Sequence, residues 1–549
     1  MRILIIGAVA AGTSAGTKAR RNNEEADIVI YEKDNFISYS GCGMPYYIGG
    51  VIENAEELTP RDPAFFKERY NIDVFTGHEV LSINPDEKAL KIKNLSTGDE
   101  FVDKYDKLVI ATGASAVVPP IKGTGRDNVF TLRNINDMNK IKAYLDENNP
   151  KSVIIVGTGF VGLEMCENFK ALGLDVTMVE MLPQVTPGLD SDMAIYLQEH
   201  LEDKGVKVLT DVSATEINDK GVFLSDGRQV EGDLILLATG VRPNTRLAEE
   251  AGVELGETKA IKVDERMRTN IEDIYSCGDS VEQFSVITGR PIYRPLGSTA
   301  NKTGRITGDS MTGGNLTFRG ILGTGIFEVF GMAVAQTGLS EREARDQGFD
   351  VAVIHNIKPN KPGYMGGEEM VIKAVADKDS GRLIGVQIVG FEGVDKRIDV
   401  FITAITFKAK VEDLFHLDLA YAPQFSTTKD PVMYTGMILD NVINRDRPVI
   451  TVEELEELIK SGKKLKIIDT RKSSQFDEGH VDIAENIPHE KVRYLIKELD
   501  TDTSYVTYCN RGTTGNAVQN ILLNNGFKEV YNLSGGHVNF SKNKDHNHE

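Results

Sequence analysis

Two segments of the chain repeat a pattern of an apolar strand, a glycine-rich turn and a helix. The first starts at Ile3 and continues through residues 7–12 as GAVAAG. The second starts at Val153 and continues through residues 157–162 as GTGFVG. In such a turn the first amide groups of the helix face the pyrophosphate of a dinucleotide. The repeat therefore predicts two dinucleotide-binding folds of the α/β class in one chain.

Each glycine-rich turn is followed by a second strand that ends in a carboxylate, Glu32 in the first copy and Glu180 in the second. A carboxylate about 20 residues beyond the turn accepts hydrogen bonds from ribose hydroxyls. Val9 replaces the middle glycine of the first copy, whereas the second copy has all three glycines. Glu180 would repel a 2′-phosphate, so the second site is predicted to prefer NADH over NADPH. A flavin and a nicotinamide are the economical pair for hydride transfer.

Three later segments fit the same scheme. Two apolar strands end in Ala-Thr-Gly, at residues 111–113 and 238–240, where the backbone crosses near a nucleotide. A third strand ends in Cys-Gly-Asp, and the carboxylate of Asp279 is placed to bond the ribityl chain of FAD. The predicted cofactor-binding residues are Gly7, Gly12, Glu32, Lys33, Ala111, Thr112, Gly113, Gly157, Gly159, Gly162, Glu180, Gly240, Gly278 and Asp279.

A lone cysteine, Cys42, lies in the segment SYSGCGMPYY, shortly after the first copy. The positions five residues before and after it are Ile37 and Tyr47, so no internal disulfide forms at that spacing. We interpret Cys42 as a single redox thiol beside the flavin. Cys509 lies in YCNRGTTG, a strand-to-loop pattern suited to holding a persulfide.

Composition limits the partners and the compartment. At 549 residues the chain is long enough for about three or four domains. Its formal charge of −20 argues against nucleic-acid binding. The four irregularly spaced cysteines, with no leader and no apolar run that could span a bilayer, predict a cytoplasmic protein without a membrane partner. No Cys/His cluster has zinc spacing, so we predict no metal site.

Together, these motifs resemble the pyridine nucleotide-disulfide oxidoreductase family over residues 1 to about 440. The SGCGMPYY segment is similar to its single-cysteine branch, which includes coenzyme A disulfide reductases, persulfide reductases, NADH oxidases and peroxidases. The resemblance to the coenzyme A members implies a homodimer in which Tyr421 and Tyr364 reach the partner's active site as proton donors. It also implies coenzyme A as ligand or substrate. The implied contacts are Ser14, Lys18, Arg21, Ser38, Asn301 and Lys429. Gly41 and Lys18 depart from the asparagine and glutamine that some members have.

A further unit begins after Pro448, where Thr451 and Glu454 form the capping pattern of a helix. The unit resembles a single rhodanese domain with Cys509 as its sulfur carrier. Its loop departs from the common Cys-x-x-Gly-x-Arg pattern, because Thr514 takes the arginine position and Arg511 lies inside the loop.

The predicted architecture is therefore α/β, with two Rossmann-like FAD- and NAD-binding domains, an α+β dimerisation domain and an α/β rhodanese domain. The expected ranges are 1–115 and 245–325 for FAD, 116–244 for NAD(P)H, 326–440 for dimerisation, 441–450 for a linker, 451–541 for rhodanese and 542–549 for a polar tail.

The predicted function is FAD-dependent reduction of coenzyme A persulfide, polysulfide or coenzyme A disulfide by NADH through Cys42, with Cys509 carrying sulfane sulfur. One alternative is an NADH oxidase or peroxidase that cycles Cys42 through sulfenic acid. Another is a redox-sensing protein whose flavin state controls the binding of partners to the C-terminal domain.

Overall fold

The computed structural model describes residues 1–544 and divides the chain into two compact units. The N-terminal unit contains residues 1–183 and 206–321, and the C-terminal unit contains residues 184–205 and the chain from residue 322 onward. The last five residues of the predicted polar tail lie outside the described part.

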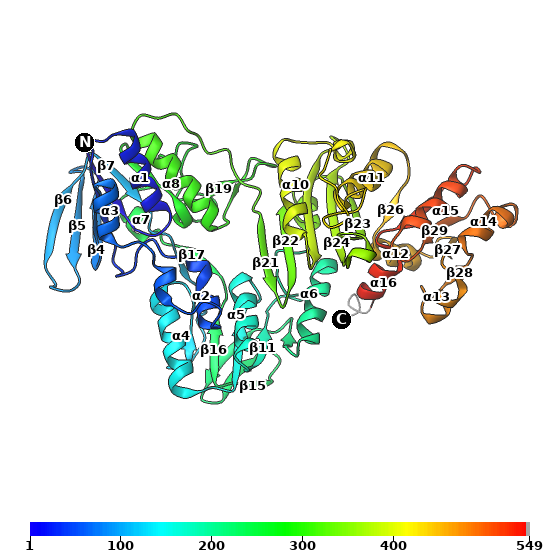
Figure 1. The fold of residues 1–549 in the computed structure, drawn as a ribbon, viewed down its shortest axis with the longest axis horizontal. Helices are drawn as coiled ribbons and strands as arrows, with labels where there is room; N and C mark the ends of the chain where they lie inside the picture. Colours follow the sequence, from blue (N-terminus) through cyan, green and yellow to red (C-terminus); the bar gives the residue numbers. More distant parts are fainter. Residues whose placement is uncertain (545–549) are drawn as a thin grey trace. The chain divides into compact units, whose positions relative to one another are not determined.

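A parallel five-stranded sheet forms the centre of the predicted FAD-binding domain, in the order β18-β7-β1-β2-β3. Its strands are β1 (Arg2–Ile6), β2 (Asp27–Tyr31), β3 (Asp73–Phe75), β7 (Lys107–Ile110) and β18 (Ile274–Ser276). Helices α1 (Ala11–Asn22) and α8 (Gly297–Met311) lie side by side (Figure 1). Ile3, Leu4 and Ile5 are fully buried, as expected for a parallel strand covered on both faces. The remaining elements here are α2 (Met44–Ile48), α3 (Pro63–Tyr70), α7 (Arg246–Glu250), β4 (His78–Asn84), β5 (Ala89–Asn94), β6 (Glu100–Lys104), β19 (Gln283–Phe284) and β20 (Pro291–Ile292).

The second sheet repeats this plan, with the order β12-β11-β10-β16-β9 and parallel pairing throughout. Its strands are β9 (Val129–Phe130), β10 (Ser152–Val156), β11 (Asp175–Val179), β12 (Lys207–Leu209) and β16 (Leu234–Leu237). The accompanying elements are α4 (Ile135–Asn148), α5 (Phe160–Ala171), β8 (Ala114–Ala116), β13 (Ala214–Asn218), β14 (Gly221–Leu224), β15 (Gln229–Glu231) and β17 (Val241–Pro243). Cys166 and Cys277 are fully buried, in keeping with a packing role.

The C-terminal unit contains an antiparallel sheet in the order β21-β22-β25-β24-β23. Its strands are β21 (Gly325–Val329), β22 (Met332–Gly338), β23 (Val351–Pro359), β24 (Glu369–Asp377) and β25 (Leu383–Gly390). Helices α10 (Val394–Thr406) and α11 (Pro431–Asn444) pack on it, and α9 (Glu341–Asp346) contacts β23.

A parallel sheet in the order β26-β30-β29-β27-β28 forms the last domain. Its strands are β26 (Val449–Ile450), β27 (Leu465–Asp469), β28 (Ala484–Asn486), β29 (Ser504–Tyr508) and β30 (Val530–Leu533). Its helices are α12 (Val452–Lys460), α13 (Ser473–Glu478), α14 (His489–Leu495), α15 (Thr513–Leu523) and α16 (Gly536–Asn543). Thr451 and Glu454 form the predicted capping box at the start of α12. Lys542 and Asn543, assigned to the polar tail from the sequence, instead belong to α16, where Asn543 is buried.

Helix α6 (Ser191–Asp203) lies in the range assigned to the NAD(P)H-binding domain, yet it packs with the C-terminal unit. Asp192 explains this position, because its carboxylate accepts hydrogen bonds from buried Lys373 at 2.8 Å and from His355 at 2.8 Å. His355 also donates its backbone N–H to Ser534 of the last domain at 2.6 Å. A buried polar network therefore joins α6, the antiparallel sheet and the last domain.

The fold class predicted from the sequence is confirmed. Within residues 1–544, no helix combines the length and apolar character needed to cross a membrane. The same residues contain no group of three or more His, Cys, Asp or Glu side chains arranged to hold a metal ion.

Candidate functional site

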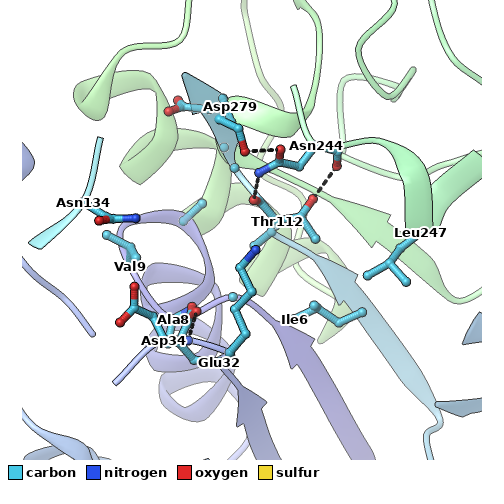
Figure 2. A pocket seen from close by; sticks show the side chains of 18 of the residues that line it. Ile6, Ala8, Val9, Glu32, Asp34, Thr112, Asn134, Asn244, Leu247 and Asp279 are labelled. Atoms are coloured by element: carbon cyan, nitrogen blue, oxygen red, sulfur yellow. Dashed lines mark hydrogen bonds between the residues drawn. The ribbon is translucent and has the colours of Figure 1, made fainter. Parts of the chain in front are cut away.

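A cavity of about 600 Å³ opens at the carboxyl ends of β1, β2 and β7 in the N-terminal unit. Its volume is within the range of cofactor pockets, and its position is the usual one for a nucleotide in an open parallel sheet. The predicted cofactor-binding residues that line it are Gly7, Glu32, Lys33, Ala111, Thr112, Gly113, Gly278 and Asp279. Several of them are drawn in Figure 2.

Close backbone packing makes glycine necessary at the first turn. Gly7 has a φ of +105°, and a Cβ atom there would overlap the carbonyl oxygen of Ala111. A Cβ atom on Gly12 would in turn overlap the carbonyl of Gly7. These contacts bring the start of α1 close to the strand ends, which leaves its first amides available to a pyrophosphate.

Glu32 lines this cavity directly after β2. Its carboxylate accepts the N–H groups of Ala8 and Asp34, both at 2.9 Å. Figure 2 shows Glu32 beside Ala8 and Asp34. Burial raises the pKa of Glu32, although these two amides act against that shift. The oxygens retain lone pairs for ribose hydroxyls. The cavity, the glycine turn and this carboxylate together fit FAD.

Two lining residues, Arg133 and Asn244, were not predicted from the sequence. Arg133 forms an ion pair with Asp279 at 2.7 Å, so the carboxylate expected at the ribityl chain already has a cationic partner. The side-chain amide of Asn244 donates to the Thr112 carbonyl at 2.8 Å, and the backbone carbonyl of Asn244 accepts from the Thr112 hydroxyl at 2.7 Å (Figure 2). Neither residue belongs to a local motif, and the fold alone brings them to the cavity.

The second glycine turn has the same geometry as the first. Gly157 has a φ of +104°, and a Cβ atom there would overlap the carbonyl of Ala238, which precedes Thr239 and Gly240. A Cβ atom on Gly162 would overlap the carbonyl of Gly157, just as one on Gly12 would overlap the carbonyl of Gly7. Gly159 is the N-cap residue of α5 and has open space around it. The turn thus leaves room for a second dinucleotide.

Glu180 is buried behind this turn. One of its oxygens accepts the N–H of Thr158 at 3.0 Å and the hydroxyl of Thr158 at 2.7 Å. The other accepts the N–H of Leu182 at 3.0 Å. Glu180 therefore holds the glycine turn in place while its negative charge stays beside the expected ribose position.

Cys42 lies in a single 3-10 turn (Gly41–Gly43) immediately before α2, and its side chain is exposed. Helix α2 contacts both α4 and α5, so the cysteine segment packs beside the second dinucleotide fold. The pKa of the Cys42 thiol is raised, first by desolvation and then by the carboxylates of Glu164 and Asp279, whereas Arg133 lowers it. Glu164, on α5, was also missed from the sequence, and burial raises its own pKa to about 7.

Four of the predicted substrate contacts gather on α1 and α8. The Ser14 hydroxyl donates to Asn301 at 2.8 Å, and Lys18 pairs with Asp309 at 3.0 Å. Arg21 is exposed at the end of α1, with its guanidinium carbon 5.7 Å from the centre of the Tyr70 ring. Ser38, with a φ of 49°, donates its N–H to the Ala8 carbonyl, which ties it to the first glycine turn.

The two predicted proton donors, Tyr364 and Tyr421, and the last predicted substrate contact, Lys429, belong to the C-terminal unit. Tyr364 and Tyr421 are 78% and 50% exposed, so their hydroxyls are open to a ligand or a second subunit. The Lys429 ammonium lies 5.9 Å from the centre of the Tyr434 ring.

Cys509 follows β29 at the base of a loop that leads into α15. It is buried, at 7% exposure, and its sulfur accepts the N–H of Thr514 at 3.2 Å. An amide donor of this kind stabilises a thiolate or a persulfide anion. In the same domain, His480 stacks on Phe476, with ring centres 3.7 Å apart, and His489 begins α14.

The fold and the site define a flavoprotein class with two dinucleotide-binding sites, a single thiol near the first, and a rhodanese-like domain. The chain belongs to the pyridine nucleotide-disulphide oxidoreductase family, whose model matches residues 1–294. The dimerisation domain of this family matches residues 326–431, and a rhodanese-like domain matches residues 451–543. The family fold implies FAD and NAD(P)H as cofactors, and the dimerisation domain supports a homodimer.

Two solved structures are similar over nearly the whole chain. CoADR-RHD of Bacillus anthracis is 35% identical, with a TM-score of 0.96, and the match covers 98% of each chain. An NAD-dependent persulfide reductase from A. fulgidus is 36% identical, with a TM-score of 0.91, covering 98% of this chain and 100% of that one. An NADH oxidase of Methanocaldococcus jannaschii is 38% identical over 79% of this chain and 97% of the relative.

Other relatives carry names from sulfur metabolism. A protein of Pyrococcus horikoshii, named NAD(P)H coenzyme A polysulfide/persulfide reductase, is 34% identical over 80% of this chain. A protein of Staphylococcus haemolyticus, named coenzyme A disulfide reductase, is 31% identical over 79% of it. These matches cover 98% of both relatives. The family resemblance inferred from the sequence is confirmed. The predicted class, a flavin-dependent disulfide or persulfide reductase, is confirmed as well.

Proposed function

We propose that this protein uses NADH to reduce coenzyme A persulfide, polysulfide or coenzyme A disulfide through Cys42, and that Cys509 carries sulfane sulfur. The observation that carries the proposal is the exposed, unpaired Cys42 beside two glycine-turn folds, in a chain that also holds a rhodanese-like Cys509. The names of the relatives support the same chemistry.

The substrate contacts follow from the arrangement on α1 and α8. Coenzyme A carries phosphates, and Lys18 and Arg21 offer cations at one end of these helices. Asp309 neutralises part of the Lys18 charge, so Arg21 is the stronger candidate for a phosphate contact. Ser14, Ser38 and Asn301 offer neutral polar groups, and Lys429, which lies just before α11, is a separate candidate cation.

FAD, when bound, would supply the redox chemistry that links hydride transfer from NADH to two-electron reduction of sulfur. The Cys42 thiolate attacks the disulfide or persulfide bond of the substrate, a new S–S bond to Cys42 forms, and a thiolate or hydrosulfide leaves with the bonding pair. The electron pair that NADH supplies then breaks the S–S bond to Cys42, which releases the second product and restores the thiolate. Tyr421 or Tyr364 of the partner subunit protonates the leaving sulfur. The surrounding protein groups raise the pKa of Cys42 and so disfavour its thiolate. A reactive thiolate therefore needs another stabilising group, and we expect the bound flavin to provide it.

We expect NADH rather than NADPH as the donor, because Glu180 places a negative charge where a 2′-phosphate would lie. Comparison of kcat/KM for the two donors checks this point. A value for NADPH equal to or above that for NADH would contradict it.

The proposal is tested by anaerobic oxidation of NADH by the FAD-loaded enzyme, with coenzyme A persulfide, coenzyme A disulfide or no sulfur substrate. Turnover should require a sulfur substrate, with one sulfide released per NADH from the persulfide or two thiols from the disulfide. The name of the Methanocaldococcus jannaschii relative favours an NADH oxidase as a second candidate. Activity that appears only after oxygen is admitted would support that candidate instead.

A further inference from the structure

The loop after Cys509 contains one cation, and that cation is already paired. Residues 509–515 read CNRGTTG, so Arg511 is their only basic residue. Its guanidinium forms an ion pair with Glu369 of β24, in the neighbouring antiparallel sheet. Thr514 occupies the position where the common loop has arginine. The loop itself therefore leaves little positive charge for an anion on Cys509.

Lys358 approaches this loop from the end of β23. Its ammonium donates to the Thr513 hydroxyl oxygen at 2.9 Å and lies 4.4 Å from the centre of the Tyr434 ring. Thr513 is the first residue of α15, and the next amide, that of Thr514, donates to the Cys509 sulfur. A single lysine thus connects the antiparallel sheet to the helix start that faces the thiol.

Electrostatics supports a coupling between Lys358 and the thiol. Burial lowers the pKa of Lys358, and Arg511 lowers it further, whereas Cys509 acts in the opposite direction. A hydroxyl that accepts a bond from an ammonium group also becomes a stronger donor itself. Thr513 can therefore pass part of the lysine charge to an anion in the loop.

We propose that Lys358 of the dimerisation domain is a positioning residue of the rhodanese-like site, holding Thr513 and supplying positive charge to an anionic sulfur on Cys509 in place of Arg511, which is paired with Glu369. This inference rests on the proposed role of Cys509 as a carrier of sulfane sulfur. The sulfur-carrying site would then be formed by residues of both the dimerisation domain and the rhodanese-like domain.

The reaction that this site would support is sulfur transfer from an anionic donor. With thiosulfate, the Cys509 thiolate attacks the sulfane sulfur, a new S–S bond forms, and the S–SO₃ bond breaks. Sulfite leaves with the electron pair of that bond, and Cys509 retains the sulfur as a persulfide anion. No external oxidant or reductant is needed, because the sulfane sulfur only changes its partner.

The test compares Lys358→Met, Lys358→Arg and wild type as full-length, FAD-loaded protein. Cys509 is alkylated with iodoacetamide across a pH series and quantified by peptide mass spectrometry. The reagent is neutral, so its rate reports the thiolate without an effect of donor charge. Lys358→Met should lower the rate at pH 7 by about three- to tenfold and move the pH profile upward, and Lys358→Arg should restore most of it.

Lys378→Met is the matched control, since Lys378 is an exposed lysine of the same domain that pairs with Asp350. It should leave the alkylation profile unchanged. An unchanged profile in Lys358→Met would overturn the role of the lysine. Thiosulfate:cyanide transfer by wild type and Cys509→Ala is measured alongside. If wild type shows no Cys509-dependent transfer, the proposed sulfur-carrying function fails instead.

Discussion

Of the charged side chains that act on Cys42, Glu164 opposes the thiolate most strongly. Desolvation is the largest cause of the raised pKa of the thiol, and the Glu164 carboxylate is the second. Since burial raises the pKa of Glu164 to about 7, this carboxylate is neutral in mild acid and charged above neutrality. The group therefore opposes ionisation of Cys42 more strongly as the pH rises through 7.

Replacing Glu164 with Gln should lower the pH at which Cys42 becomes reactive, because the negative charge is removed and the shape is kept. We expect alkylation of Cys42 at pH 8 to be about two- to fivefold faster than in wild type, measured by peptide mass spectrometry. Glu147→Gln, on the exposed end of α4, is the control and should match wild type. A slower or unchanged reaction in Glu164→Gln would argue against this role.

At the residue scale, sequence predicts what local chain geometry requires. Gly7, Glu32 and Gly157 follow from the spacing of a turn between a strand and a helix. Arg133 and Glu164 reach the site from separate parts of the chain, so their role depends on tertiary packing. No pattern near either residue could have revealed it.

At the scale of elements, the two glycine turns are close copies, and each requires glycine at its first position. Ala at position 157 would meet the Ala238 carbonyl and would hold a left-handed backbone conformation. Gly157→Ala should therefore destabilise the turn by at least about 2 kcal/mol. It should slow flavin reduction by NADH more than tenfold without loss of FAD, because the Gly7 turn is untouched.

Stopped-flow flavin absorbance and FAD content measure these two effects. Gly125→Ala is the control, since Gly125 has open space around it and should behave as wild type. Full-speed reduction by NADH in Gly157→Ala would show that the second turn does not hold the nicotinamide cofactor. Equal loss of FAD from this variant would show instead that the two copies are not independent.

Some elements are predictable from neighbouring residues, and others depend on tertiary contacts. Apolar runs before the glycine turns predict β1 and β10, and the spacing of Thr451 and Glu454 predicts the capping box of α12, because each feature is determined by neighbouring residues. Helix α6 is different. Its sequence position lies within the second nucleotide-binding segment, but the helix belongs to the C-terminal unit, where Asp192 pairs with Lys373. Only the tertiary partners of Asp192 reveal that assignment.

On the scale of the C-terminal unit, the buried ion pairs around Lys373 are the main electrostatic connection. Burial raises the pKa of Asp192, but Lys373 and His355 outweigh it and hold the pKa well below its ordinary value of 3.8. The ionised carboxylate therefore contributes stability above that pH, and the contribution is lost as the pH falls toward the depressed value.

Asp192→Asn should lower the stability of the unit by about 2 to 4 kcal/mol, because Lys373 stays buried with fewer partners. The readout is a Tm several degrees lower at pH 7, with a smaller difference in acid. Asp350→Asn removes an exposed ion pair and should change the Tm little. An unchanged Tm in Asp192→Asn would mean that the network does not stabilise the unit.

For the whole molecule, the central claim is that Cys42 is the sulfur through which NADH reduces the substrate. The most direct test is anaerobic mixing of wild type and Cys42→Ser, both FAD-loaded, with NADH and coenzyme A disulfide or persulfide. Cys42→Ser should retain FAD and still show flavin bleaching by NADH, yet release no thiol or sulfide. Substantial release of thiol or sulfide by Cys42→Ser would contradict the account.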